Sequence, residues 1–185
     1  MEDISLHILD IAENSVAAGA TLIRIGVVDR RDEDSFVIEI EDNGKGMPED
    51  LVAKALDPFF TSRTTRNVGL GLSLLAQAAR ETGGDISIKS TAGAGTLVRA
   101  QFRPAHIDMK PLGDIAETLA VLIAGNPGID FSFSYDFDKG GGPFTFDTRD
   151  IRAELENIPI NAPEVISFLR NSLGAALNDI KNKVV

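Results

Sequence analysis

The 185 residues are 43% hydrophobic and 25% charged, which is typical of a globular chain with one full core rather than of a disordered one. The formal net charge of −10 argues against a nucleic-acid ligand, because phosphate-backbone contacts need clustered Lys and Arg. The chain has no cysteine and its two histidines are His7 and His106, so thiolate chemistry and histidine-rich metal sites are excluded. The acidic start and the lack of a long apolar run indicate neither a signal peptide nor a membrane span, and we expect a cytoplasmic protein with no membrane partner.

Residues 4–18 are predicted to form a helix with two neighbouring apolar stripes, one of which ends at Ser15. Between the stripes, polar residues recur at spacings of four, three and four and therefore share one helix face: Asp3, His7, Asp10 and Asn14. This face is either an ordinary polar side turned to water or a carboxylate and a carboxamide that point into a pocket.

Two strands are predicted next, at residues 22–28 and 35–41, with the alternation of an antiparallel sheet covered on one side. The second strand runs into E-D-N-G-K-G-M-P, where Asp42 is followed by Gly44 and Gly46. Asp-Asn-Gly alone is a common turn signal. Two glycines also permit positive φ and close approach of another group. The stretch therefore predicts either a plain turn or a place where a ligand edge lies against Asp42, and Pro48 then begins a helix.

Residues 57–71, D-P-F-F-T-S-R-T-T-R-N-V-G-L-G, match no regular element. From Thr61 to Arg66 every side chain carries a hydroxyl or guanidinium group of the kind that contacts phosphate, and the candidate phosphate contacts are Thr61, Ser62, Arg63 and Thr64. Gly69 and Gly71 then open a helix, and the free N–H groups and dipole at such a helix start suit an anion. Strands at residues 85–90 and 95–102 complete a sheet with one apolar face.

The remainder, residues 104–185, predicts a helix that ends at Gly125, a β-hairpin with strictly alternating aromatic residues, and two further helices. The hairpin aromatics fit either plain core packing or a docking surface for a partner. We expect two domains, residues 1–103 and residues 104–185.

Four of these stretches occur in the order of the motifs of the GHKL or Bergerat ATP-binding domain, which DNA gyrase, the large heat-shock chaperone, sensor histidine kinases and mismatch-repair ATPases share. E-N-S-V-A-A-G-A resembles the N box, E-D-N-G-K-G-M the first glycine box, D-P-F-F-T-S-R-T the F box, and V-G-L-G-L-S-L-L with G-A-G-T-L-V the second glycine box and its closing strand. From Asp57 onward the likeness is greatest to sensor histidine kinases, whereas the N box resembles the mismatch-repair group. The resemblance implies an α/β (α+β) two-layer sandwich, with a mixed, mainly antiparallel sheet covered on one face by helices, plus a small α+β C-terminal tail.

The resemblance also implies a site for ATP and Mg²⁺. Asn14 matches the asparagine that ligates Mg²⁺, and Asp42 matches the aspartate that accepts a hydrogen bond from the adenine amino group, assisted by Thr96. Asp10 occupies the place of a glutamate that activates water or a substrate hydroxyl, one methylene shorter here. Further glycines match those beside the purine and the phosphates: Gly44, Gly46, Gly69 and Gly71.

In a sensor histidine kinase a phospho-acceptor histidine precedes this domain, whereas here the N box begins near Met1. We expect His7 to be a helix-face histidine with a hydrogen-bond partner, and His106 to be a solvent-facing linker residue. The expected function is binding of Mg·ATP with slow hydrolysis or phosphoryl transfer to an unidentified protein partner. Two alternatives remain: a non-catalytic, nucleotide-gated regulator that binds a protein, and a DNA-repair role by analogy with the mismatch-repair motif.

Overall fold

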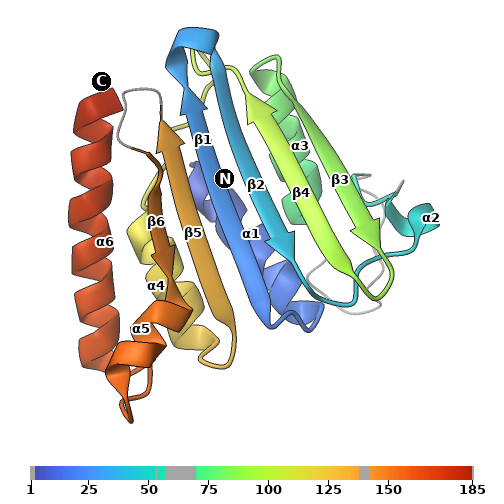
Figure 1. The fold of residues 1–185 in the computed structure, drawn as a ribbon. Coiled ribbons are helices and arrows are strands. Elements are labelled where there is room, and N and C mark those ends of the chain that lie inside the picture. The colour runs from blue at the N-terminus through green and yellow to red at the C-terminus, as the bar shows by residue number, and fades with distance from the viewer. Residues whose placement is uncertain (1–2, 53, 57–69, 138–141, 185) are drawn as a thin grey trace.

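The computed structural model describes residues 3–52, 54–56, 70–137 and 142–184 (Figure 1). Its helical segments are α1 (Ile4–Ala17), the 3₁₀ turn η1 (Arg31–Glu33), α2 (Glu49–Val52), α3 (Leu70–Glu81), α4 (Ile115–Gly125), α5 (Thr148–Leu155) and α6 (Pro163–Val184). Its strands are β1 (Leu22–Arg30), β2 (Ser35–Asp42), β3 (Asp85–Thr91), β4 (Gly95–Phe102), β5 (Asp130–Phe137) and β6 (Phe144–Asp147). The helices and strands predicted in these ranges are present, although the helix after Pro48 is only four residues long.

The strands form one sheet in the order β3-β4-β2-β1-β5-β6. Neighbouring strands are antiparallel except β1 and β5, which are parallel, so the expected mixed, mainly antiparallel sheet is confirmed. The register sets Asp42 of β2 opposite Thr96 of β4, and Thr96 opposite Ser90 of β3. Side chains at paired positions lie on the same face of a sheet, so these three residues form one row.

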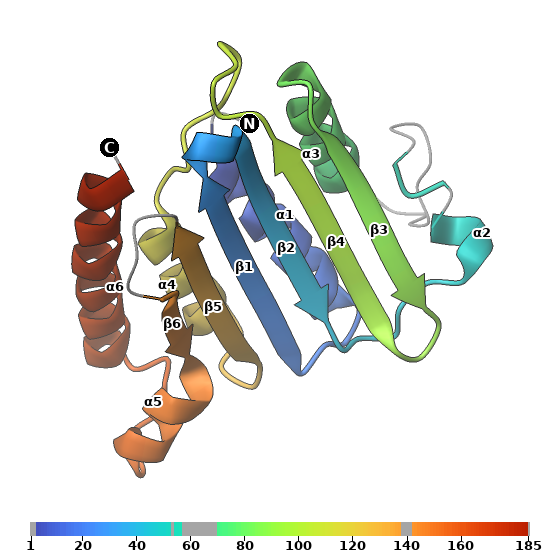
Figure 2. The same cartoon turned by 45° about the horizontal axis from the view of Figure 1, so that its top comes forward.

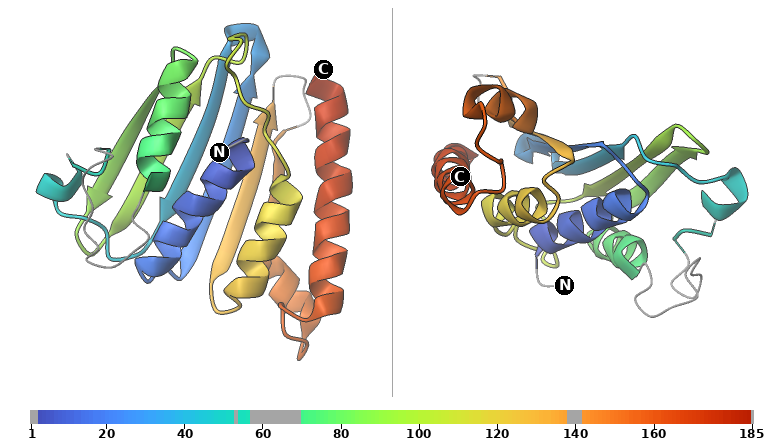
Figure 3. Two further views of the ribbon diagram at one scale, coloured as in Figure 1. Left: turned by 180° about the vertical axis from the view of Figure 1, so that it is seen from behind. Right: turned by 90° about the horizontal axis from the view of Figure 1, so that it is seen from below.

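Of the described helices, α1, α3, α4 and α6 cover one face of the sheet (Figure 3). Seen from behind, α3, α1, α4 and α6 lie side by side across the sheet, and the view from below shows them in a single layer (Figure 3). The open face carries exposed ion pairs such as Arg24–Glu41 at 3.1 Å and Arg99–Glu39 at 3.0 Å, as expected of a face turned to water. The expected two-layer sandwich is therefore confirmed.

The first helix forms where its apolar spacing predicts it. Asp3 is the N-cap and accepts a hydrogen bond from the Leu6 backbone N–H. Ile4, Ile8 and Ile11 are at most 2% exposed and belong to the main core. Because this apolar stripe fixes the rotation of α1, Asp10 of the polar stripe lies against Gly71 at the start of α3.

The C-terminal residues continue the same sheet. β5 pairs with β1 from Leu22–Asp130 to Asp29–Phe137, and its inward aromatics Phe131, Phe133 and Tyr135 are at most 3% exposed. These three aromatic side chains therefore pack in the core and do not form a docking surface. Residues on both sides of position 103 thus share one sheet and one core, and α5 and α6 lie at the β6 edge (Figure 2).

Among the described helices, none combines the length and the apolar character that crossing a bilayer requires.

His7 differs from expectation. It is 1% exposed, and neither imidazole nitrogen has a hydrogen-bond partner among the described residues. The predicted partner is therefore wrong, because the α1 face at His7 is closed over by packing instead of being turned to polar groups. Burial, aided by the nearby Lys110 ammonium group, lowers the pKa of His7 to about 4. His106, by contrast, is exposed as expected.

The buried imidazole should make stability depend on pH. The folded-state pKa of His7, about 4, lies below the ordinary value of 6.5, so the unfolded chain takes up the proton first and stability falls as the pH drops from 6.5 toward 4. Between pH 7 and pH 5 this one group should cost about 2 kcal/mol of unfolding free energy. Urea unfolding at the two pH values checks this: His7→Leu should show a pH-dependent loss smaller by that amount. An equal loss in both proteins contradicts the assignment.

Candidate functional site

Asp42 lies at the C-terminal end of β2, on the helix-facing side of the sheet, and is 8% exposed. Its Oδ2 accepts a hydrogen bond from the Ser15 hydroxyl at 2.7 Å, and its Oδ1 accepts one from the Gly44 backbone N–H at 2.8 Å. Each carboxylate oxygen has a further lone pair. The arrangement therefore holds a charged carboxylate in a fixed orientation whose remaining capacity is to accept hydrogen bonds from a donor.

Thr96 is held beside this carboxylate by Ser90. The Ser90 hydroxyl oxygen is 2.8 Å from the Thr96 Oγ1, accepts a hydrogen bond from the Met47 N–H at 2.8 Å, and lies 2.9 Å from the Gly95 carbonyl oxygen. One side chain thus ties the end of β3, the start of β4 and the loop after β2 together. The row Asp42, Thr96 and Ser90 is a polar end of the sheet face that Ile40, Val98 and Ile88 continue into the core.

The glycines of the first glycine box allow close packing within the chain. A Cβ at Gly44 would lie 3.0 Å from Ala18 and from the Asp42 carboxylate, and a Cβ at Gly46, where φ is +61°, would lie 2.0 Å from the Thr91 carbonyl oxygen. Both positions therefore exclude side chains because of neighbouring protein atoms. Their expected role beside a purine stays a prediction.

Asp10 lies against the first turn of α3. A Cβ at Gly71 would be 3.1 Å from the Asp10 Cβ and 3.3 Å from its Oδ2, so glycine is what lets the two helices meet here. Burial raises the pKa of Asp10. The structure thus brings together two residues that the sequence placed in separate motifs: a carboxylate of raised basicity and a helix start suited to an anion.

Asn14 is one helical turn beyond Asp10 on the same face of α1 and is half-buried. Its carboxamide makes no side-chain hydrogen bond to the residues that the structure describes, which leaves its oxygen available as a ligand. No group of three or more His, Asp or Glu side chains suited to a metal ion occurs in the described part of the chain. A cation at this site would need most of its ligands from water and from a bound anion.

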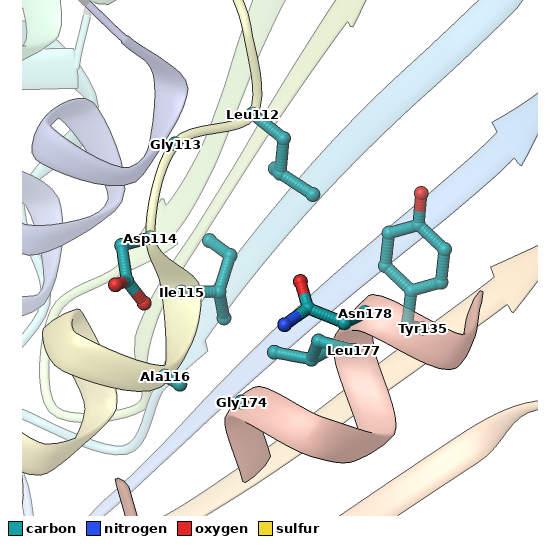
Figure 4. A pocket seen from close by; sticks show the side chains of 9 residues that line it. All are labelled: Leu112, Gly113, Asp114, Ile115, Ala116, Tyr135, Gly174, Leu177 and Asn178. Carbon is teal, nitrogen blue, oxygen red and sulfur yellow. The ribbon is translucent and has the colours of Figure 1, made fainter. Parts of the chain in front are cut away.

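A groove of about 780 Å³ lies along the Asp42–Thr96 row. Its walls come from the ends of β2, β3 and β4, from the β3–β4 turn and from α2, and include Met47, Val52 and Ile88. A second hollow of about 140 Å³ lies between α4 and α6 (Figure 4). Pockets that hold cofactors and drug-sized ligands span about 300–1,000 Å³, so of these two hollows the groove is the one large enough for a nucleotide base with its ribose.

Five predicted site residues lie outside the described residues: Thr61, Ser62, Arg63, Thr64 and Gly69. The expected contacts between these side chains and phosphate stay predictions.

Sequence reasoning missed two residues of the site. Ser15 was placed in an apolar stripe of α1, and Ser90 was treated as an ordinary strand residue, yet both orient the Asp42–Thr96 pair. A signal was present in each case: Ser15 is the polar member of a buried isoleucine stripe, and Ser90 follows Ile86 and Ile88 at the inward positions of β3. A polar residue at an inward position needs a partner.

A family model described as histidine kinase-, DNA gyrase B- and HSP90-like ATPase matches residues 2–106. The chain belongs to this family, and the expected GHKL membership is confirmed. Residues 2–106 contain α1 to α3 and β1 to β4, and hence the whole described site.

The similar curated proteins are much longer sensor proteins. The chain is 38% identical over 87 residues to the sensor kinase CckA of Brucella abortus, an alignment that covers 46% of this chain and 9% of that protein. It is 32% identical over 99 residues to the C4-dicarboxylate transport sensor protein DctB of Pseudomonas aeruginosa, covering 53% of this chain and 16% of that protein. This chain thus matches only a small part of each relative.

Among solved structures, the N-terminal domain of a DNA repair protein superposes with a TM-score of 0.54 at 18% identity, over 78% of this chain and 52% of that one. At this identity the likeness shows a shared fold.

Proposed function

We propose that this chain binds Mg·ATP in the groove beside Asp42, and that it hydrolyses ATP slowly or transfers the γ-phosphoryl group to a partner protein. The observation that carries the proposal is the Asp42 carboxylate, buried and oriented by Ser15 and Gly44 at the edge of a groove large enough for a nucleoside. A buried acceptor of this kind selects a ligand with an amino group at that point, because a ligand without a donor there leaves the remaining lone pairs of the carboxylate unused.

The phosphates would extend from the groove toward the start of α3. There the N–H groups of the first helical turn and the helix dipole favour negative charge, and Gly71, which has no side chain, lets Asp10 lie against this turn. Asn14 would contribute its carboxamide oxygen to Mg²⁺, a hard cation that keeps most of its water and binds through phosphate oxygens. The donor set is compatible with this group, since nucleotide-bound Mg²⁺ keeps several waters and takes further ligands from phosphate oxygens, so it needs no full protein cage.

Asp10 is the group that would act on the attacking oxygen. It would accept the proton from water or from a hydroxyl of a partner protein while that oxygen bonds to the γ-phosphorus and the bond to the β–γ bridging oxygen breaks, releasing ADP. The raised pKa of Asp10 supports this role, because a more basic carboxylate is a better proton acceptor.

The second candidate is a regulator that binds nucleotide without turnover. One observation favours this regulator: Asp10 is one methylene shorter than the glutamate that the family resemblance implies, so its carboxylate reaches less far toward the attacking oxygen. A DNA-repair role is not favoured: the likeness to a DNA repair protein concerns the fold, and the net charge of −10 opposes contact with a phosphate backbone.

Calorimetric titration with ATP tests the proposal directly. Binding should be tighter in the presence of Mg²⁺ than in EDTA, because the cation would link the phosphate oxygens to the carboxamide oxygen of Asn14. GTP should bind at least about 100-fold more weakly, since its oxygen in place of the amino group would face the acceptor-only Asp42. Equal affinity with and without Mg²⁺, or equal affinity for the two nucleotides, contradicts the site assignment.

A further inference from the structure

The N-terminus of α1 is capped by a segment from far along the chain, residues 110–113, which we call the clamp segment. The Ile4 backbone N–H donates to the Pro111 carbonyl oxygen at 3.0 Å, and the Ser5 N–H donates to the Leu112 carbonyl oxygen at 2.9 Å. The first four N–H groups of a helix have no partner inside the helix. Two of those of α1 are therefore satisfied by the clamp segment.

Gly113 is packed into the cap itself. Asp3 accepts hydrogen bonds from the Leu6 N–H at 3.0 Å and the Ser5 hydroxyl at 2.7 Å. Gly113 has φ of +78°, and a Cβ there would lie 2.5 Å from both the Asp3 Cγ and the Ser5 Oγ. Any side chain at position 113 would push the capping groups away from the helix start.

The clamp segment connects α1 to the elements around it. At one end, Lys110 lies 4.0 Å from Glu81 in the last turn of α3. At the other end the chain enters α4, which packs on α6 through Glu117 and Arg170 at 2.6 Å. In Figure 4 the chain runs from Leu112 and Gly113 into α4, and Leu177 and Asn178 of α6 line the same hollow. The C-terminal helices are thus connected, through the clamp segment, to α1, the helix that carries Asp10, Asn14 and Ser15.

Asp10 lies midway along α1, and Asn14 and Ser15 lie near its C-terminal end. A helix is stiff along its axis, so a shift or rotation at its first turn moves the side chains two and three turns later. The Ser15–Asp42 hydrogen bond of 2.7 Å and the contact of Asp10 with Gly71 both depend on that placement.

We infer that the clamp segment is a positioning element of the nucleotide site, with Gly113, Asp3 and Ser5 setting the placement of α1 on which Asp10, Asn14 and Ser15 depend. The inference rests on the nucleotide-binding function proposed above. By linkage, a nucleotide that prefers correctly placed α1 must in turn stabilise the clamp.

The test compares Gly113→Ala with Gly142→Ala. Gly142 has nearly the same φ, +79°, but a Cβ at that position would meet no other atom within 4 Å, so the variant reproduces the backbone strain without the collision. With both variants shown to be folded by circular dichroism, Gly113→Ala should weaken Mg·ATP binding at least about fivefold, whereas Gly142→Ala should stay within about twofold.

Hydrogen exchange on the unaltered chain supplies a second measurement that does not depend on the folding of a variant. Mg·ATP should slow exchange of the Ile4 and Ser5 amides, whose hydrogen bonds to the clamp segment would be stabilised by linkage. If Gly113→Ala binds as tightly as the native chain and these amides do not respond to nucleotide, the inference is overturned while the proposed function stands. If the native chain does not bind Mg·ATP, the proposed function fails and the inference fails with it.

Discussion

Replacing Asp42 by Asn should weaken ATP binding about 100-fold, corresponding to about 3 kcal/mol. The Asp42 carboxylate accepts hydrogen bonds from Ser15 and from the Gly44 N–H, one on each oxygen, and keeps acceptor capacity for a ligand amino group. An amide in its place carries a donor on one side, which must face the Ser15 hydroxyl, the Gly44 N–H or the ligand. Facing the Gly44 N–H or the ligand amino group, this donor meets another donor and a buried hydrogen bond is lost. Facing the Ser15 hydroxyl, which can accept as well as donate, it reverses that hydrogen bond and leaves a single acceptor oxygen. In every orientation the negative charge is lost as well.

Titration calorimetry measures this effect, with Glu39→Gln as the matched control. Glu39 lies on the same strand but on the open face, in an exposed pair with Arg99 at 3.0 Å, and such pairs are worth at most about 1 kcal/mol. The control should bind ATP as the native chain does. If Asp42→Asn binds ATP with unchanged affinity, the purine does not bind at Asp42 and the site assignment is wrong.

Replacing Asp10 by Asn should leave ATP affinity within about threefold and lower turnover at least about 100-fold. The carboxylate lies against Gly71 at the start of α3, where the γ-phosphate would be held, and an amide cannot take up the proton of the attacking oxygen. Native turnover should also rise with pH through the raised pKa of Asp10, because only the ionised form is a base. Release of ADP and phosphate over a pH series, with single-turnover rates, measures both effects.

Glu13→Gln is the control for Asp10→Asn. Glu13 is exposed and lies about 100° from Asn14 around α1, so its charge should not matter to turnover. If Asp10→Asn and the native chain turn over at the same measurable rate, another group is the base. If the native chain binds ATP but neither hydrolyses it nor transfers its phosphoryl group to any acceptor tested, the chain acts as a nucleotide-binding regulator without catalysis.

The candidate site could be predicted in its parts but not in its assembly. Asp10, Asn14 and Asp42 stand out because each is a polar residue in a patterned stretch, and the order of the motifs identifies the family. Ser15 was not predicted as a site residue because a single serine is as common in a buried helix stripe as in a binding site. Whether its hydroxyl reaches Asp42 depends on how α1 lies over β2, and the helix pattern alone carries no information on that placement.

The sequence by itself determined the local elements, because helix and strand periodicities involve residues only a few positions apart. The polar-striped helix α1 and the aromatic hairpin of β5 and β6 could both be recognised in this way. The tertiary structure alone decided that β5 pairs in parallel with β1, that His7 is buried without a hydrogen-bond partner among the described residues, and that residues 110–113 cap α1. Each of these depends on packing between distant parts of the chain, and alternation along a strand does not specify which strand lies beside it.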